Sequence, residues 1–110
     1  MSFERRARIC ALNDQLRTEH HGGRILITAG VMNEGPAFVL ASLGAAKRFA
    51  DFDESNDPYG EHDFGAVSIG DQRVFWKIDY YDQSLTSAAV DPAEEDGCVR
   101  VMTLMLAEEY

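Results

Sequence analysis

The spacing of apolar residues along the first half of the chain predicts two amphipathic helices. Residues 3–20 contain neither glycine nor proline, and Ile9, Leu12 and Leu16 recur at intervals of three and four, which places them on one helix face. A second helix is expected to begin at Pro36, because proline is favoured in the first helical turn. Its expected apolar stripe and flanks comprise Phe38, Val39, Leu40, Leu43, Ala46, Phe49 and Ala50.

Two other segments have the composition of strands within a sheet. Residues 24–30 (RILITAG) are short, rich in β-branched side chains and bounded by glycines, and we expect a buried strand there. Residues 98–107 are apolar on both faces. This pattern favours a central strand, although a helix also satisfies it on periodicity alone.

A β-hairpin is predicted between residues 64 and 81. The segments 64–69 and 73–81 flank Gly70-Asp71, which supplies turn chemistry. Alternation along the second segment divides its side chains between two faces, with Val74, Trp76, Ile78 and Tyr80 on one face and Phe75, Lys77, Asp79 and Tyr81 on the other.

The predicted order of elements is α-β-α-β-β-β, which is typical of an α+β fold. We expect a mainly antiparallel sheet with both helices packed on one face. The chain has 110 residues, a length that predicts a single domain covering residues 1–110.

The charge of the chain restricts its partners. Its formal net charge is −9, and residues 25–110 alone carry −11. Such a body repels phosphates, which argues against direct nucleic-acid binding, and attracts a protein partner with a basic surface. No apolar stretch is long enough to span a membrane, and no signal peptide is evident. Cys10 and Cys98 have no metal-ligand spacing, so we expect two free thiols, no metal, no cofactor and a cytoplasmic protein.

The segment 51–63 is the most acidic part of the chain, with six carboxylates and one histidine. It fails as a calcium loop, because Asn56 stands where glycine is required and His62 where a bidentate glutamate is required. We interpret it as a solvated acidic loop that, together with a second loop at 91–96, binds the partner. The candidate binding residues are Asp51, Asp53, Glu54, Asp57, Glu61, Asp63, Asp91, Glu94, Glu95 and Asp96.

His62 is the candidate for chemistry. A histidine flanked by carboxylates can be oriented for general-base work, and the hairpin brings residue 62 near residues 77–81. The candidate catalytic residues are therefore Glu61, His62, Asp63, Lys77 and Asp79. The alternative, a structural one that is commoner for a lone histidine, is that Glu61, His62 and Asp63 only fasten the loop to the sheet.

Four segments together resemble a family of short bacterial proteins of unknown function that are often carried by mobile elements. They are RILITAG (24–30), NDPYGEHDFG (56–65), VFWKIDYYD (74–82) and LMLAEEY (104–110). The EHDFG and FWKIDYYD motifs are specific, whereas VMNEG (31–35) departs from the pattern and leaves the start of the second helix open. The resemblance implies no activity and no catalytic residue.

Two functional hypotheses follow. The first is a small acidic protein-binding module, for instance a mobile-element inhibitor of a host nucleic-acid-binding defence complex. The second is a metal-assisted or general-base hydrolase centred on His62. We favour the first, and with it a protein that is not an enzyme.

Overall fold

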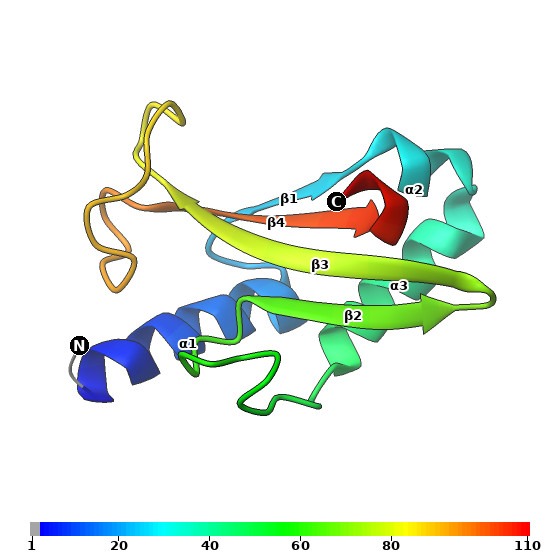
Figure 1. The fold of residues 1–110 in the computed structure, drawn as a ribbon. Coiled ribbons are helices and arrows are strands. Elements are labelled where there is room, and N and C mark those ends of the chain that lie inside the picture. Colours follow the sequence, from blue (N-terminus) through cyan, green and yellow to red (C-terminus); the bar gives the residue numbers. More distant parts are fainter. Residues whose placement is uncertain (1–2) are drawn as a thin grey trace.

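The structure, a computed structural model, describes residues 3–110 and has the predicted α+β architecture (Figure 1). The elements in chain order are α1 (Phe3–Glu19), β1 (Arg24–Ile27), α2 (Ala29–Asn33), α3 (Pro36–Arg48), β2 (Phe64–Ile69), β3 (Gln72–Tyr81), β4 (Val99–Leu106) and the 3₁₀ turn η1 (Ala107–Glu109). The order predicted from sequence is confirmed, with α2 and η1 as additions.

The four strands form one mixed sheet in the order β1-β4-β3-β2. β3 is antiparallel to both β2 and β4, whereas β1 is parallel to β4. The sheet is therefore mainly antiparallel, as expected. The segment 98–107 does contain a strand, β4, and this strand lies between β1 and β3.

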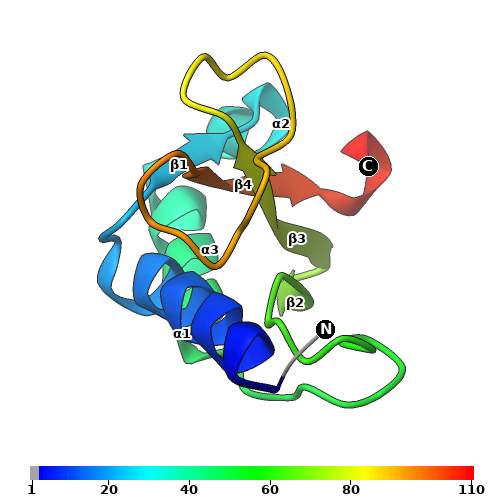
Figure 2. The ribbon, with the colours of Figure 1, turned by 90° about the vertical axis from the view of Figure 1, so that its left-hand side faces the viewer.

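Helices α1 and α3 lie on the same face of the sheet (Figure 2). The alternation predicted for β3 is confirmed, because Val74, Trp76 and Ile78 are 0–3% exposed and point toward the helices. The central core between the two layers comprises Leu16, Val31, Ala46, Val74, Trp76, Ile78, Met102, Leu104 and Leu106.

The prediction for residues 24–30 was wrong in length and in burial. β1 ends at Ile27 and is an edge strand, so Leu26 is 54% exposed. The chain then turns into α2, whose N-terminus is capped by the Thr28 side chain, which accepts a hydrogen bond from the Val31 amide. The Glu109 carboxylate accepts hydrogen bonds from the Gly30 amide and the Thr28 hydroxyl, at 3.0 and 2.6 Å. These caps, which come partly from the far end of the sequence, end the strand.

The second predicted helix begins at Pro36 as expected, but two members of its predicted apolar stripe do not belong to the core. Leu40 is 71% exposed, because it lies on the side of α3 that faces away from the sheet. Ala50 follows the end of the helix at Arg48 and is exposed.

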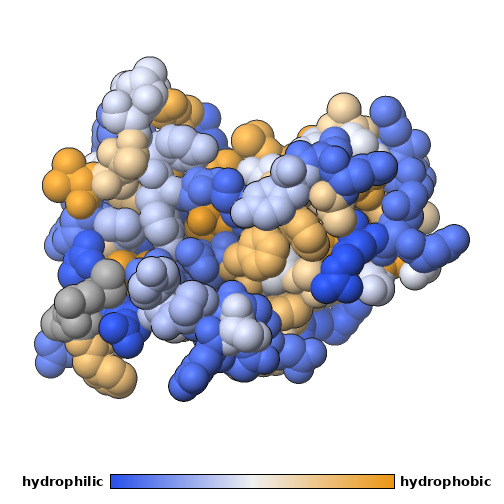
Figure 3. All heavy atoms as spheres, viewed as in Figure 1, coloured by the Kyte–Doolittle hydropathy of each residue, from blue (hydrophilic) through white to orange (hydrophobic). Residues whose placement is uncertain are grey.

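The EHDFG and FWKIDYYD motifs lie side by side where β2 pairs with β3. Gly65 pairs with Trp76, and a Cβ atom at Gly65 would lie 2.4 Å from Trp76 Nε1. The absence of a side chain at Gly65 therefore leaves room for the fully buried indole of Trp76. On the other face of the sheet, Phe64 and Phe75 pack edge to face at 5.2 Å, and Tyr110 adds a third ring. Figure 3 shows apolar side chains gathered over this part of β2 and β3.

Two further expectations concern the cysteines and the membrane. Cys10 and Cys98 are both free thiols, as predicted. Among residues 3–110, none of the helices has the length and apolar character needed to cross a membrane.

Candidate functional site

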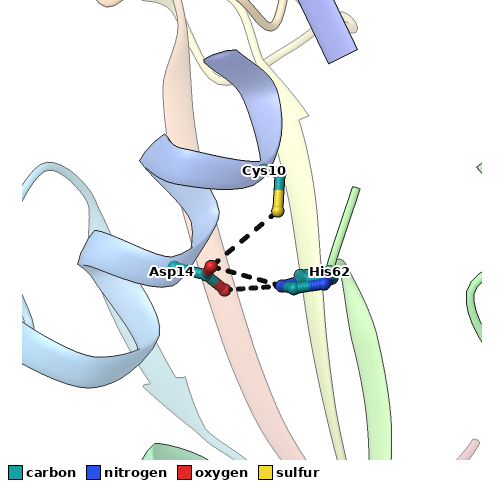
Figure 4. A group of neighbouring side chains, drawn as sticks. All are labelled: Cys10, Asp14 and His62. Carbon is teal, nitrogen blue, oxygen red and sulfur yellow. Dashed lines mark hydrogen bonds and ion pairs between the residues drawn. The ribbon is translucent and has the colours of Figure 1, made fainter. Parts of the chain in front are cut away.

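The strongest cluster of chemically capable side chains lies between α1 and the loop that precedes β2, and His62 is at its centre. His62 has a left-handed backbone conformation, with φ of 56°, which is uncommon for a residue with a side chain. This conformation turns the ring toward α1, where Nδ1 lies 2.9 Å from Asp14 Oδ1 (Figure 4). The ring also stacks on Phe52, with a centroid distance of 3.7 Å and an interplanar angle of 4°.

Asp57 supports His62 from the other side. Residues 57–60 form a turn, in which the Gly60 amide donates to the Asp57 carbonyl at 3.1 Å. Asp57 is buried, and its side chain is only 5% exposed. It accepts hydrogen bonds from the amides of Glu61 and His62, and it lies 3.7 Å from His62 Nε2. The imidazole therefore lies between two carboxylates, those of Asp14 and Asp57.

Cys10 is the third member of the cluster and stands one helical turn before Asp14. Its Sγ atom lies 3.8 Å from Asp14 Oδ2. Burial, and secondly the charge of Asp14, raise the pKa of the Cys10 thiol to about 11, so that the thiol is protonated at neutral pH. This protonation state argues against Cys10 as a free nucleophile, because the reactive form is the thiolate.

Arg17 connects the cluster to the core. Its guanidinium group donates to Asp14 Oδ1 at 2.8 Å and to the carbonyls of Ala46 and Phe49 at 2.9 Å each. These carbonyls belong to the C-terminal end of α3, where helices leave carbonyls without intrahelical partners. Arg17 therefore holds the end of α3 against α1 and keeps the Asp14 carboxylate in place.

A second buried network adjoins the first through Asn13. The Asn13 amide donates to the Tyr80 hydroxyl at 2.8 Å and to the Glu61 carbonyl at 3.0 Å, and its oxygen accepts from Arg100 Nε. The Tyr80 hydroxyl donates to the Glu61 carboxylate at 3.3 Å. Burial raises the pKa of Tyr80, which keeps the phenol neutral. This network fastens Glu61 to α1 through Asn13 and to β3 through Tyr80.

The predicted catalytic residues do not converge on His62. Lys77 and Asp79 pair with each other at 3.3 Å, and the β3 alternation places them on the sheet face opposite to the helices. Glu61 and Asp63 lie beside His62 in sequence, but its ring contacts Asp14, Asp57 and Phe52 instead. Sequence reasoning missed Cys10 and Asp14, and only their spacing of four on one helix could have indicated them.

The acidic candidates differ in accessibility. Asp51, Asp53 and Glu54 are exposed, and so are Glu94 and Asp96, whereas Asp57 is buried. In the second loop, Asp91 pairs with Arg5 at 2.7 Å and Glu95 pairs with Arg8 at 3.0 Å. The positive end of α1 thus neutralises part of the second loop, and the first loop retains the freer carboxylates.

Asp63 gives a test of the electrostatics of this region. Burial, and to a lesser extent the charges of Asp57 and Asp79, raise the pKa of Asp63 above its ordinary value. A carboxyl group whose pKa is raised in the folded state lowers the free energy of unfolding at neutral pH. This loss becomes smaller as the pH falls through that pKa. We therefore expect Asp63→Asn to raise the melting temperature at pH 7, with a difference from wild type that shrinks toward pH 3. A lower melting temperature at pH 7 would contradict this.

Comparison with known proteins identifies the family of the chain. Residues 27–109 match the family described as "Protein of unknown function (DUF3768)", and the chain belongs to it. No curated protein and no solved structure matched the chain. The match begins after α1, so His62, Asp57 and Tyr80 lie within it, whereas Cys10 and Asp14 lie in the preceding helix.

Proposed function

Starting from a family whose function is not described, we propose that this protein is a binding module that accepts an extended, basic segment of a partner protein along the outer edge of β2. The observation that carries the proposal is an acidic and aromatic hollow beside this edge. The hollow has a volume of about 440 Å³, and its wall includes Asp51, Asp53, Phe64 and Phe75.

The edge itself can accept a strand. β2 is the last strand of the sheet, and within residues 3–110 no strand pairs with its outer side. A second hollow of about 410 Å³ continues along Ala66, Val67 and Ser68. An extended peptide can add to such an edge through main-chain hydrogen bonds, while neighbouring hollows receive alternate side chains.

The charge of the hollow favours a basic side chain. The hydroxyl and the backbone amide of Ser55, and the backbone amide of Asn56, donate to the Asp53 carboxylate and lower its pKa, so it stays ionised well below neutral pH. Two carboxylates stand against the single guanidinium of Arg73 in this wall. An arginine of the partner would meet both the carboxylates and the aromatic rings, which attract cations.

The partner class follows from the same chemistry. Proteins that bind nucleic acids present basic segments to phosphates, and the net charge of −9 steers such proteins toward this chain. Inhibition of a nucleic-acid-binding defence complex by covering its basic surface is the form of the proposal that agrees with the sequence analysis.

A labelled peptide that alternates arginine and valine tests the proposal. Fluorescence anisotropy should show binding that weakens steeply with added salt. The Asp51→Asn/Asp53→Asn double variant should bind about 3- to 10-fold more weakly, since each exposed charge contributes up to about 1 kcal/mol. The matched control, Glu94→Gln/Asp96→Asn, removes the same charge from the second loop.

The location of binding is measured separately. Amide chemical shifts of residues 64–69 should change most on addition of the peptide. Equal losses in the two double variants, or shift changes that avoid β2, would show that general charge attraction rather than the β2 edge binds the peptide. The double variant then serves as the negative control for capture of the natural partner from nuclease-treated bacterial lysate.

A further inference from the structure

We propose that Cys10, Asp14 and His62 form a binding site for a single Zn²⁺ ion. The three side chains come from α1 and from the loop before β2, and their donor atoms all lie within 4.8 Å of one another. Figure 4 shows the three side chains pointing toward a common point. The inference is independent of the β2 edge and stands or falls separately from the proposed function.

The distances between donor atoms fit tetrahedral zinc. Asp14 Oδ2 lies 3.8 Å from Cys10 Sγ and 3.2 Å from His62 Nδ1. With ordinary zinc bond lengths and tetrahedral angles, sulfur and oxygen ligands stand about 3.6 Å apart and nitrogen and oxygen ligands about 3.3 Å apart. These two distances need shifts of only a few tenths of an ångström. The third distance, between Cys10 Sγ and His62 Nδ1, is at most 4.8 Å and must approach about 3.6 Å around one ion.

Asp14 and His62 are each held by a further partner, and an ion would replace the 2.9 Å contact between His62 Nδ1 and Asp14 Oδ1. Asp14 uses Oδ1 to accept from Arg17 at 2.8 Å, which leaves Oδ2 for the ion. With zinc on Nδ1, the other ring nitrogen of His62 carries the proton and faces the Asp57 carboxylate, 3.7 Å away. A carboxylate behind the histidine is the usual support of a zinc-bound imidazole, and the stacking on Phe52 fixes the plane of the ring.

The donor set selects the metal. One sulfur, one nitrogen and one oxygen suit Zn²⁺, whereas Mg²⁺ and Ca²⁺ require oxygen ligands. The ion replaces the thiol proton of Cys10, because only the thiolate binds zinc. Since the ion must displace this proton, binding becomes tighter as the pH rises.

The fourth position of the ion would be open. A hollow of about 420 Å³ lies beside the start of α1, and Cys10, Asp14 and Gly60 are part of its wall. Three protein ligands and an accessible fourth position are typical of zinc sites that bind a water molecule or a substrate atom. A metal ion here would be the feature that the hydrolase hypothesis from the sequence lacked.

Cobalt spectroscopy tests the inference, because Co²⁺ replaces Zn²⁺ and bonds between Co²⁺ and thiolate absorb in the near ultraviolet. The reduced, untagged wild-type protein should bind one equivalent of Co²⁺ at pH 8 with this absorption, and added Zn²⁺ should abolish it. Cys10→Ser should lose the absorption and bind Zn²⁺ at least about 10-fold more weakly, and His62→Gln should bind at least about 10-fold more weakly. Lowering the pH from 8 to 6.5 should weaken binding in wild type.

Matched controls separate this site from other donors of the chain. Cys98→Ser removes the other thiol, and His20→Gln/His21→Gln removes the adjacent histidines that follow α1; both variants should bind like wild type. Absorption that survives Cys10→Ser, or that disappears with Cys98→Ser, would overturn the assignment, as would the absence of Co²⁺ and Zn²⁺ binding at pH 8. If His62→Gln does not fold, Cys10→Ser decides the question, and its melting temperature without metal verifies folding.

Discussion

Replacing Arg17 by methionine is expected to lower the free energy of unfolding by about 3 kcal/mol. Arg17 is only 4% exposed. Without its guanidinium group the carbonyls of Lys47 and Phe49 lose their donor at the end of α3, whereas the Ala46 carbonyl keeps only the Phe49 amide. Each buried acceptor left without a partner costs about 1–3 kcal/mol, and the Asp14 carboxylate also loses its counter-charge. Chemical denaturation of wild type and variant measures the difference.

The control for Arg17→Met is Arg24→Met. Arg24 begins the edge strand β1 and is exposed, so the same change in side chain should alter stability by no more than about 0.5 kcal/mol. A loss below about 1 kcal/mol for Arg17→Met would mean that water replaces the guanidinium group at the end of α3, and that the contact between the two helices is less important than the geometry implies.

The second large effect is expected from Gly65→Ala, which should destabilise the fold by about 2–3 kcal/mol. The new methyl group would stand 2.4 Å from Trp76 Nε1. The indole cannot move aside, because Phe49 and Phe52 pack edge-on against it at 5.6 and 6.0 Å. Thermal and chemical unfolding should agree on the loss, and near-ultraviolet circular dichroism should report a changed environment of the single tryptophan.

Gly44→Ala is the matched control for this substitution. Gly44 lies within α3, where an added Cβ would meet only the flexible end of Arg48, at 3.0 Å. Alanine is favoured over glycine in helices by up to about 1 kcal/mol, so this variant should be as stable as wild type or more stable. If Gly65→Ala were as stable as wild type, Trp76 would have to adopt a rotamer different from the one in the structure.

The elements that the sequence predicted well are those whose own residues determine them. The α3 start at Pro36 and the hairpin turn at Gly70-Asp71 depend on local chemistry. The apolar alternation around Trp76 depends on strand geometry alone. In contrast, the end of β1 and the start of α2 depend partly on Glu109, which lies 81 residues after Thr28 and 79 residues after Gly30. The residues next to Thr28 in sequence do not indicate that Glu109 accepts hydrogen bonds there.

The candidate site was predicted only as far as His62. Its adjacent carboxylates, Glu61 and Asp63, suggested a local triad, because neighbours in sequence are the only neighbours that sequence shows. In the structure, His62 has a left-handed backbone conformation, and its ring contacts Asp14 of α1 rather than Glu61 or Asp63. Asp57 was counted among the solvated acids, whereas the turn at 57–60 folds its carboxylate back onto the amides of the following residues.

The position of β4 has a consequence for how the protein is made. β4 is the last of the four strands to be synthesised, yet it joins β1 to β3, so the sheet cannot close before residues 99–106 have left the ribosome. At about 5–20 residues per second, β1 waits roughly 4–15 s for its parallel partner. During that time the apolar faces of α1 and of the β2–β3 hairpin have no complete core to enter, and the nascent chain is a natural client for a chaperone that shields such surfaces.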